Sequence, residues 1–188
     1  MKKLLWEPSD QHKEKSNMTK FINFVNEKFG LELKTYTDLY QWSVTSIPDF
    51  WAAMWGFGDI RASRDYDTVV ENLDDMLGAR WFTGAELNFA QNLLRYRDDR
   101  TAIIFKSEMQ DPVRISYNEL YDRVARLARS LRDMGITSGD RVAGFMPNMM
   151  ETVIAMLATT SIGAIWSSCS TDFGLKGVLD RFGQIEPR

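Results

Sequence analysis

The chain has 188 residues, a formal net charge of −3 and a hydrophobic share of 44%. This length and composition indicate either one folded domain with an appendage or two small domains, and they exclude a disordered chain. Because an acidic balance offers no basic surface to phosphates or lipid headgroups, neither nucleic acid nor a membrane is expected as a partner.

The counts of histidine and cysteine exclude further classes of chemistry. One histidine and one cysteine cannot supply the roughly four ligands of a zinc site. A cysteine or serine nucleophile also needs a nearby base. We interpret His12 as a solvated side chain and Cys169 as a small buried residue. No residue of the chain is predicted to be catalytic or to bind a metal.

The opening apolar run resembles the start of a signal peptide. Glu7 and Pro8 end this run well short of the ~7 to 15 apolar residues that a signal peptide needs. The longest other apolar stretch is broken by Thr159 to Ser161, so it is too short for a bilayer span of ~20 residues. We therefore expect a soluble, cytoplasmic protein.

The first sixty residues are predicted to form helices rich in aromatic side chains. Segment 17–30 has apolar residues at helical spacing and ends on a glycine, which often terminates a helix. Thr35 with Asp38, and Ser46 with Asp49, match the capping box and predict two more helices. The aromatic residues could form a ligand cage, but their helical spacing favours packing in a core or at a domain interface.

Short mixed elements, followed by two strand-like runs, are expected in the middle of the chain. Segments 69–70 and 81–82 are short elements with soft boundaries, and residues 87–94 follow them. Segments 102–105 and 113–115 are strand-like runs on either side of a polar connection. A β-hairpin is the simplest interpretation of these two runs.

From Ser116 onward the pattern alternates between helix and strand. Ser116 and Glu119 form a capping box before a long helix, whose arginines are expected on a solvated, salt-bridged face. Residues 141–146 predict a buried strand, and residues 164–166 begin another. The alternation predicts a parallel sheet with right-handed crossovers.

Helix caps are expected at two further places. Asn148 with Glu151 predicts the start of the helix between the two strands. Thr171 or Asp172 is expected to cap a last helix. The predicted fold class is therefore α/β, with a helical N-terminal cap over residues 1–95 and the beginning of a parallel-sheet, β-α-β domain over residues 96–188.

The candidate site is the run of small polar residues 167–172, expected beyond the carboxyl end of a parallel strand. Ligands collect there in open parallel sheets. Small residues let a ligand approach the backbone, and the hydroxyls of Ser168, Ser170 and Thr171 can donate to phosphate or amide oxygens. The alternative is structural, since Ser, Thr and Asp are also the usual helix caps.

Long stretches of the sequence resemble the acyl- and aryl-CoA synthetases, which are adenylate-forming ligases. They are "MPNMMETVIAMLATTSIGAIWSSCSTDFG" (146–174), "WFTGAELNFAQNLLRYRDDRTAII" (81–104) and "VLDRFGQIEPR" at the end. "FWAAMWGFGDI" is similar to the N-terminal cap region of these enzymes. The resemblance covers nearly the whole chain.

The resemblance implies a two-step reaction. A carboxylic acid, by overall similarity acetoacetate, attacks the α-phosphate of ATP to give an acyl-adenylate, and the thiol of CoA then displaces AMP. Magnesium accompanies the nucleotide. In related enzymes the loop that matches Ser170, Thr171 and Asp172 lies along the CoA path. That loop is aromatic and glycine-rich there, and Asp172 would repel a phosphate unless it turns away.

Two positions depart from the family pattern, in which proline is usual where this chain has Met150 and Thr171. Neither change removes a catalytic group. Because proline is well tolerated in a first helical turn, we expect Met150 to alter rigidity more than chemistry.

The phosphate loop of this family, a Ser/Thr/Gly-rich run that ends in Pro-Lys, does not occur in the sequence. The sequence also lacks the Walker pattern and the G-x-G-x-x-G pattern. We expect the chain to be the incomplete first third of such a ligase, inactive alone and binding neither ATP nor acetoacetate productively. The alternatives are a non-catalytic remnant or interaction module, and a ligase for another short-chain acid such as acetate or propionate. An unfinished sheet edge and an exposed apolar patch predict self-association.

Overall fold

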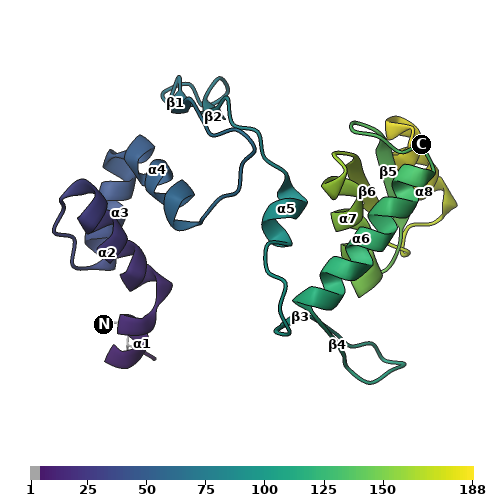
Figure 1. The fold of residues 1–188 in the computed structure, drawn as a ribbon, viewed down its shortest axis with the longest axis horizontal. Coiled ribbons are helices and arrows are strands. Elements are labelled where there is room, and N and C mark those ends of the chain that lie inside the picture. Colours follow the sequence, from purple (N-terminus) through teal and green to yellow (C-terminus); the bar gives the residue numbers. More distant parts are fainter. Residues whose placement is uncertain (1–4) are drawn as a thin grey trace. The chain divides into compact units, whose positions relative to one another are not determined.

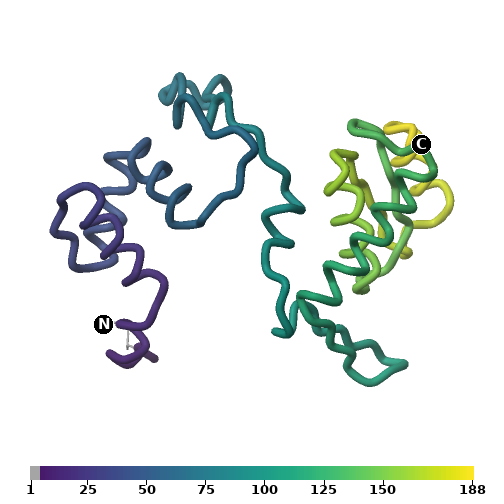
Figure 2. Tube along the Cα trace, viewed as in Figure 1, coloured from purple at the N-terminus to yellow at the C-terminus, as the bar shows by residue number. Residues whose placement is uncertain are grey.

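A computed structural model describes residues 5–188 of the chain (Figure 1). The first four residues of the apolar run that opens the sequence lie outside this range. The chain divides into two compact units, residues 1–86 and 87–188, and Figure 2 follows the backbone through both. The boundary expected after residue 95 stays a prediction. Within the described residues, no helix combines the length and apolar character that crossing a membrane requires.

The first unit consists of helices followed by a two-stranded antiparallel sheet. Its elements are α1 (Asp10–Lys15), α2 (Asn17–Phe29), α3 (Tyr36–Thr45), α4 (Ile47–Phe57), β1 (Thr68–Glu71) and β2 (Arg80–Thr83). Apolar residues of α2, α3 and α4 are buried together: Phe21, Ile22, Val25, Leu39 and Ala53. The helical spacing seen in the sequence therefore produces a core between these three helices.

The helix ends of the first unit follow the predictions in two places and differ in one. Gly30 ends α2 in the left-handed conformation, with φ of 65°, as predicted. Thr35 and Asp38 form the predicted capping box at the start of α3. Ser46, however, makes no side-chain capping bond to α4, so the second predicted capping box is wrong. The reason is that Ser46 also ends α3, which holds its backbone at φ −120° and ψ 54° instead of an extended conformation.

Aromatic side chains pack against one another throughout the first unit. Trp42 and Phe50 pack against the buried cluster, which confirms the packing interpretation for these two residues. Between α4 and β2, the rings of Trp55 and Phe82 lie 4.7 Å apart between centroids. Phe82 has φ of 48°, a strained value for a bulky side chain, and this conformation places its ring against both Trp55 and Tyr66.

The second unit mixes helices with two small sheets. Its elements are α5 (Phe89–Leu93), β3 (Thr101–Phe105), β4 (Val113–Ser116), α6 (Tyr117–Asp133), β5 (Arg141–Phe145), α7 (Met150–Ser161), β6 (Ile165–Cys169) and α8 (Leu175–Ile185). β3 and β4 form the predicted antiparallel hairpin. β5 and β6 are parallel and are connected by α7, so the predicted β-α-β crossover is present in this pair.

Fewer strands pair in parallel than the order of strands and helices predicted. The sequence pattern predicted parallel pairing among all strands that alternate with helices, whereas β4 pairs with β3 and only β5 pairs with β6 among residues 5–188. β4 pairs antiparallel with β3, to which residues 106–112 connect it, and this hairpin forms a sheet separate from that of β5 and β6.

The core of the second unit lies where α6, α7 and α5 meet β4. Its buried residues are Ala90, Leu94, Ile115, Leu120, Val124, Ala128, Met150, Ile154, Leu157 and Ala158. The predicted capping box of Ser116 and Glu119 starts α6. Asn88 links α5 to α7, because its side-chain Oδ1 accepts from the Gln91 N–H at 3.0 Å while its side-chain Nδ2 donates to the Thr160 carbonyl at 2.8 Å.

Candidate functional site

The candidate site lies at the carboxyl ends of β5 and β6. The two strands run side by side in register, with Phe145 opposite Cys169. Two loops follow at this edge: residues 146–149 lead to α7 and residues 170–174 lead to α8. The Met146 N–H donates to the Cys169 carbonyl at 3.2 Å, which joins the starts of both loops. Ligands bind at this edge in open parallel sheets.

The structure corrects which residues belong to the loop. Ser167 and Ser168 were expected beyond the strand but lie within β6, which runs to Cys169. The strand continues past the apolar residues because its pairing partner β5 continues to Phe145. Only Ser170, Thr171 and Asp172 follow the strand, and all three are exposed.

Ser170 and Asp172 are turned toward each other. The Ser170 hydroxyl donates to Asp172 Oδ2 at 2.9 Å, and the Asp172 N–H donates to Ser170 Oγ at 3.4 Å. The Phe173 N–H closes the turn on the Ser170 carbonyl at 3.2 Å. The Asp172 carboxylate is therefore partly satisfied within its own turn, which leaves the Thr171 hydroxyl as the better placed donor for a ligand.

Neither helix at this edge has a side-chain cap. α7 begins after Met149 and α8 after Gly174, and neither of these residues makes a capping hydrogen bond. The caps predicted at Asn148 with Glu151 and at Thr171 or Asp172 are therefore wrong. First-turn N–H groups without side-chain caps, at the positive end of the helix dipole, favour anionic groups. A Cβ added at Gly174 would meet no atom within 4 Å, so the backbone at the start of α8 is open to approach.

A groove of about 240 Å³ lies beside the first of these loops. Phe105 and Lys106 at the end of β3 line one part of it, and Asn148 and Met149 line another. Lys106 is the cationic side chain of this lining. The sequence pattern places Lys106 in a polar connection and predicts Asn148 as a helix cap. The signal that could have identified both residues is that each follows the end of a strand.

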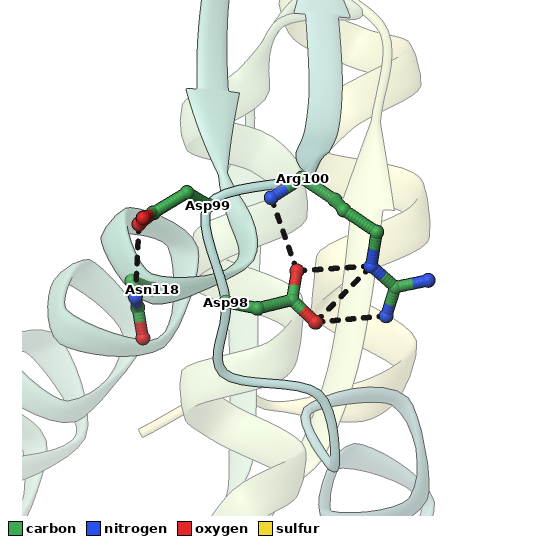
Figure 3. Close-up of polar contacts among 4 residues, drawn as sticks. All are labelled: Asp98, Asp99, Arg100 and Asn118. Atoms are coloured by element: carbon green, nitrogen blue, oxygen red, sulfur yellow. Dashed lines mark hydrogen bonds and ion pairs between the residues drawn. The ribbon is translucent and has the colours of Figure 1, made fainter.

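The carboxylate pair Asp98 and Asp99 has a structural role (Figure 3). Arg100 donates to Asp98 through Nη2 at 2.8 Å and through Nε at 3.0 Å. These bonds from Arg100 hold the pKa of the Asp98 carboxyl below its ordinary value. Asn118 donates to Asp99 at 3.2 Å, which ties this turn to the first turn of α6. The pair is therefore not arranged as a general acid and base.

Two family models match the chain. The model described as "AMP-binding enzyme" matches residues 89–188, which is more than half of the chain, and "Acetyl-coenzyme A synthetase N-terminus" matches residues 36–93. The chain belongs to the AMP-binding enzyme family. This confirms the resemblance to adenylate-forming ligases and places the β5–β6 edge within the AMP-binding match.

The similarity to other members of the AMP-binding family covers nearly all of this chain. Acetoacetyl-CoA synthetase from Danio rerio is 47% identical over 99% of the chain and 28% of its own length. The enzyme of the same name from Rhizobium meliloti (strain 1021) is 47% identical over 98% of the chain and 28% of its own length. Malonamoyl-CoA synthetase from Penicillium aethiopicum is 41% identical over 98% of the chain and 26% of its own length.

The solved structure of acetoacetyl-CoA synthetase from Streptomyces lividans has the same fold over this region. It matches with a TM-score of 0.90 and 39% identity, over 99% of this chain and 29% of that one. The chain thus spans a little over a quarter of the length of the relatives named above.

Proposed function

We propose that the chain forms the N-terminal part of an AMP-forming acid-thiol ligase that converts acetoacetate, ATP and CoA to acetoacetyl-CoA, AMP and pyrophosphate. The observation that carries this proposal is the similarity to acetoacetyl-CoA synthetases, at 45% to 47% identity over almost the whole chain. The TM-score of 0.90 to a solved member supports the same conclusion.

The residues of this chain fit one part of such a reaction. Both loops at the β5–β6 edge present N–H groups without side-chain caps, and Thr171 adds a hydroxyl. These groups suit the anionic and amide portions of CoA, which supplies the thiol that accepts the acyl group. Asp172 accepts from Ser170, so part of its charge is already hydrogen-bonded before a phosphate approaches.

The residues of this chain do not fit the magnesium ion that accompanies ATP. Residues 5–188 contain no group of three or more His, Cys, Asp or Glu side chains that could hold a metal. The sequence also lacks the phosphate loop. We therefore expect the 188-residue chain alone to release no pyrophosphate from ATP in the presence of magnesium, acetoacetate and CoA.

A chimera tests the proposed activity. The matching segment of the Rhizobium meliloti acetoacetyl-CoA synthetase is replaced by this chain, and thioester formation is measured with acetoacetate. The expected result is acetoacetyl-CoA formation at a rate within about tenfold of the parent enzyme. A chimera that folds, judged by its melting curve, but forms no thioester with any acid would favour a non-catalytic protein.

The same chimera tests which acid is used. Acetate, propionate and malonamate are compared with acetoacetate, because the malonamoyl-CoA synthetase relative is 41% identical to this chain. The chimera and the parent enzyme are compared by the ratio of kcat/KM for each acid to kcat/KM for acetoacetate. A ratio above one in the chimera, but not in the parent enzyme, would assign the chain to a ligase for that other short-chain acid. The expected cytoplasmic location stays a prediction, which cell fractionation tests.

A further inference from the structure

The groove of about 240 Å³ beside residues 146–149 has two walls within the second unit. Residues 103–106, at and just after the end of β3, form one wall. The other wall lies at the start of α7 and consists of Asn148, Met149, Met150 and Val153. A concave site with mostly apolar walls and a few polar groups is the usual form of a small-molecule site.

Lys106 supplies the charge of this groove. Among residues 5–188 it is the one charged side chain in the lining, and it is exposed. Within the same range, no carboxylate pairs with its ammonium group and no acceptor bonds to it. The three N–H donors of the ammonium are therefore free of protein partners, and an anion that enters the groove meets an uncompensated positive charge.

Asn148 adds a neutral amide on the opposite wall. The side chain is exposed, and it forms no hydrogen bond with the other residues that the structure describes. It does not cap α7, because Met149 occupies the N-cap position. The amide of Asn148 can therefore donate to a ligand oxygen.

The remaining side chains of the two walls are apolar and are held in place by the core. Ile103 and Phe105 of β3 and Val153 of α7 pack against the buried cluster of the second unit. Met150 is itself a buried member of that cluster. Because these side chains are fixed by packing, the groove is formed before a ligand binds, and its walls suit a short hydrocarbon chain.

We propose that this groove binds a small monocarboxylate with a short apolar chain. Lys106 pairs with the carboxylate, Asn148 donates to it, and the chain lies against Val153. At roughly 30 Å³ for each water-sized group, 240 Å³ holds about eight such groups, which corresponds to an acid of about five or six carbons. A phosphate monoester fits less well, since it carries about two charges at neutral pH and the groove offers one cation. The proposal does not depend on the proposed function, because this site requires neither a nucleotide nor a thiol.

Three probes with the same carbon chain test the site. The 188-residue chain is titrated with pentanoate, pentanol and pentylammonium, and the amide resonances of Lys106 and Met149 are followed by NMR. We expect pentanoate to shift both resonances with a Kd on the order of millimolar, and added salt to weaken it. Pentylammonium should shift neither. Equal affinity for pentanol and pentanoate, no shift of either resonance, or tighter binding of inorganic phosphate than of pentanoate would overturn the proposal.

Matched lysine variants locate the charge. Lys106→Gln should weaken pentanoate binding about two- to fivefold, the range for an exposed ion pair, and Lys106→Arg should retain it. Lys176→Gln removes an exposed lysine of α8 that does not line the groove, so binding should be unchanged. Equal affinity in Lys106→Gln and Lys176→Gln contradicts the proposal, provided that both variants melt like the parent chain. If Lys106→Gln does not fold, the three probes on the parent chain decide alone. Thioester formation by the chimera is a separate measurement, so its absence would reject the proposed function and leave this site intact.

Discussion

Helices α7 and α8 occupy equivalent places in the topology but have different surroundings. Each follows one strand of the same parallel pair, and they have 12 and 11 residues. α7 packs against α5 and α6 and buries Met150, Ile154, Leu157, Ala158 and Thr159. α8 packs against β5 and buries none of its residues. An apolar stripe thus predicts that a helix has a packing face, but it does not predict which partner covers that face.

Truncating one leucine in each helix should give the largest difference in stability between the buried helix α7 and the exposed helix α8. Leu157 of α7 is 2% exposed, so Leu157→Ala should lower the free energy of unfolding by about 2 to 5 kcal/mol. Leu179→Ala in α8 should change it by less than about 0.5 kcal/mol, because its side chain is mostly solvated already. Urea unfolding followed by circular dichroism measures both, and equal losses would contradict the comparison.

Two glycine substitutions test the same contrast between a tightly packed region and the exposed helix α8. A Cβ at Gly144 of β5 would overlap the ring of Trp166, so Gly144→Ala should cost about 1 to 3 kcal/mol. A Cβ at Gly183 of α8 would meet no atom within 4 Å, so Gly183→Ala should stabilise the protein by about 0.4 to 1 kcal/mol. Thermal unfolding distinguishes the opposite signs. Combining Gly144→Ala with Trp166→Leu should recover part of the loss, and strict additivity would show that the ring is not the cause.

The elements that depend on local pattern were predictable from the sequence. The spacing of apolar residues predicted α2 and α6, and both capping boxes that fit an extended N-cap residue, at Thr35 and Ser116, are present. The capping prediction for α7 failed because the helix begins one residue later than expected. With Met149 as the N-cap, Glu151 occupies the second helical position and cannot complete a capping box.

The candidate site was predicted only in part for a related reason. Its position after β6 followed from the alternation of strands and helices, but Ser170 and Asp172 bond to each other instead of capping α8. The groove beside Lys106 and Asn148 was missed because it brings together the end of β3 and the start of α7, which are distant in the chain. A pattern read along the sequence carries no information about such a long-range contact.

A buried hydroxyl in α7, the helix that packs against α5 and α6, provides a test with a smaller expected effect. Thr159 is 1% exposed, and its hydroxyl has no hydrogen-bond partner within residues 5–188, whereas Thr160 donates to the Met156 carbonyl at 2.8 Å. Thr159→Val removes an unsatisfied polar group and should raise the free energy of unfolding by about 1 kcal/mol. Thr160→Val breaks a hydrogen bond and should not stabilise. A loss of stability for Thr159→Val, measured by urea unfolding, would show that the hydroxyl is solvated or bonded.

Acid should weaken the attachment of residues 185–188 to β5 through protonation of Asp140. This is the smallest effect among the predictions made here for stability. The Thr137 N–H and hydroxyl donate to the Asp140 carboxylate, and Arg188 adds a third bond, so its pKa lies below the ordinary value of 3.8. A depressed folded-state pKa contributes stability that is complete above the unfolded value and is lost as the pH falls through the folded value. We therefore expect residues 185–188 to detach from β5 as the pH drops below about 4. The amide resonance of Arg188 should report this step.

Asp140→Asn should remove the acid dependence because no carboxylate remains to be protonated, while Arg188→Gln should keep the part that comes from Thr137. An acid transition that is identical in Asp140→Asn and in the parent chain would show that another carboxylate controls this attachment.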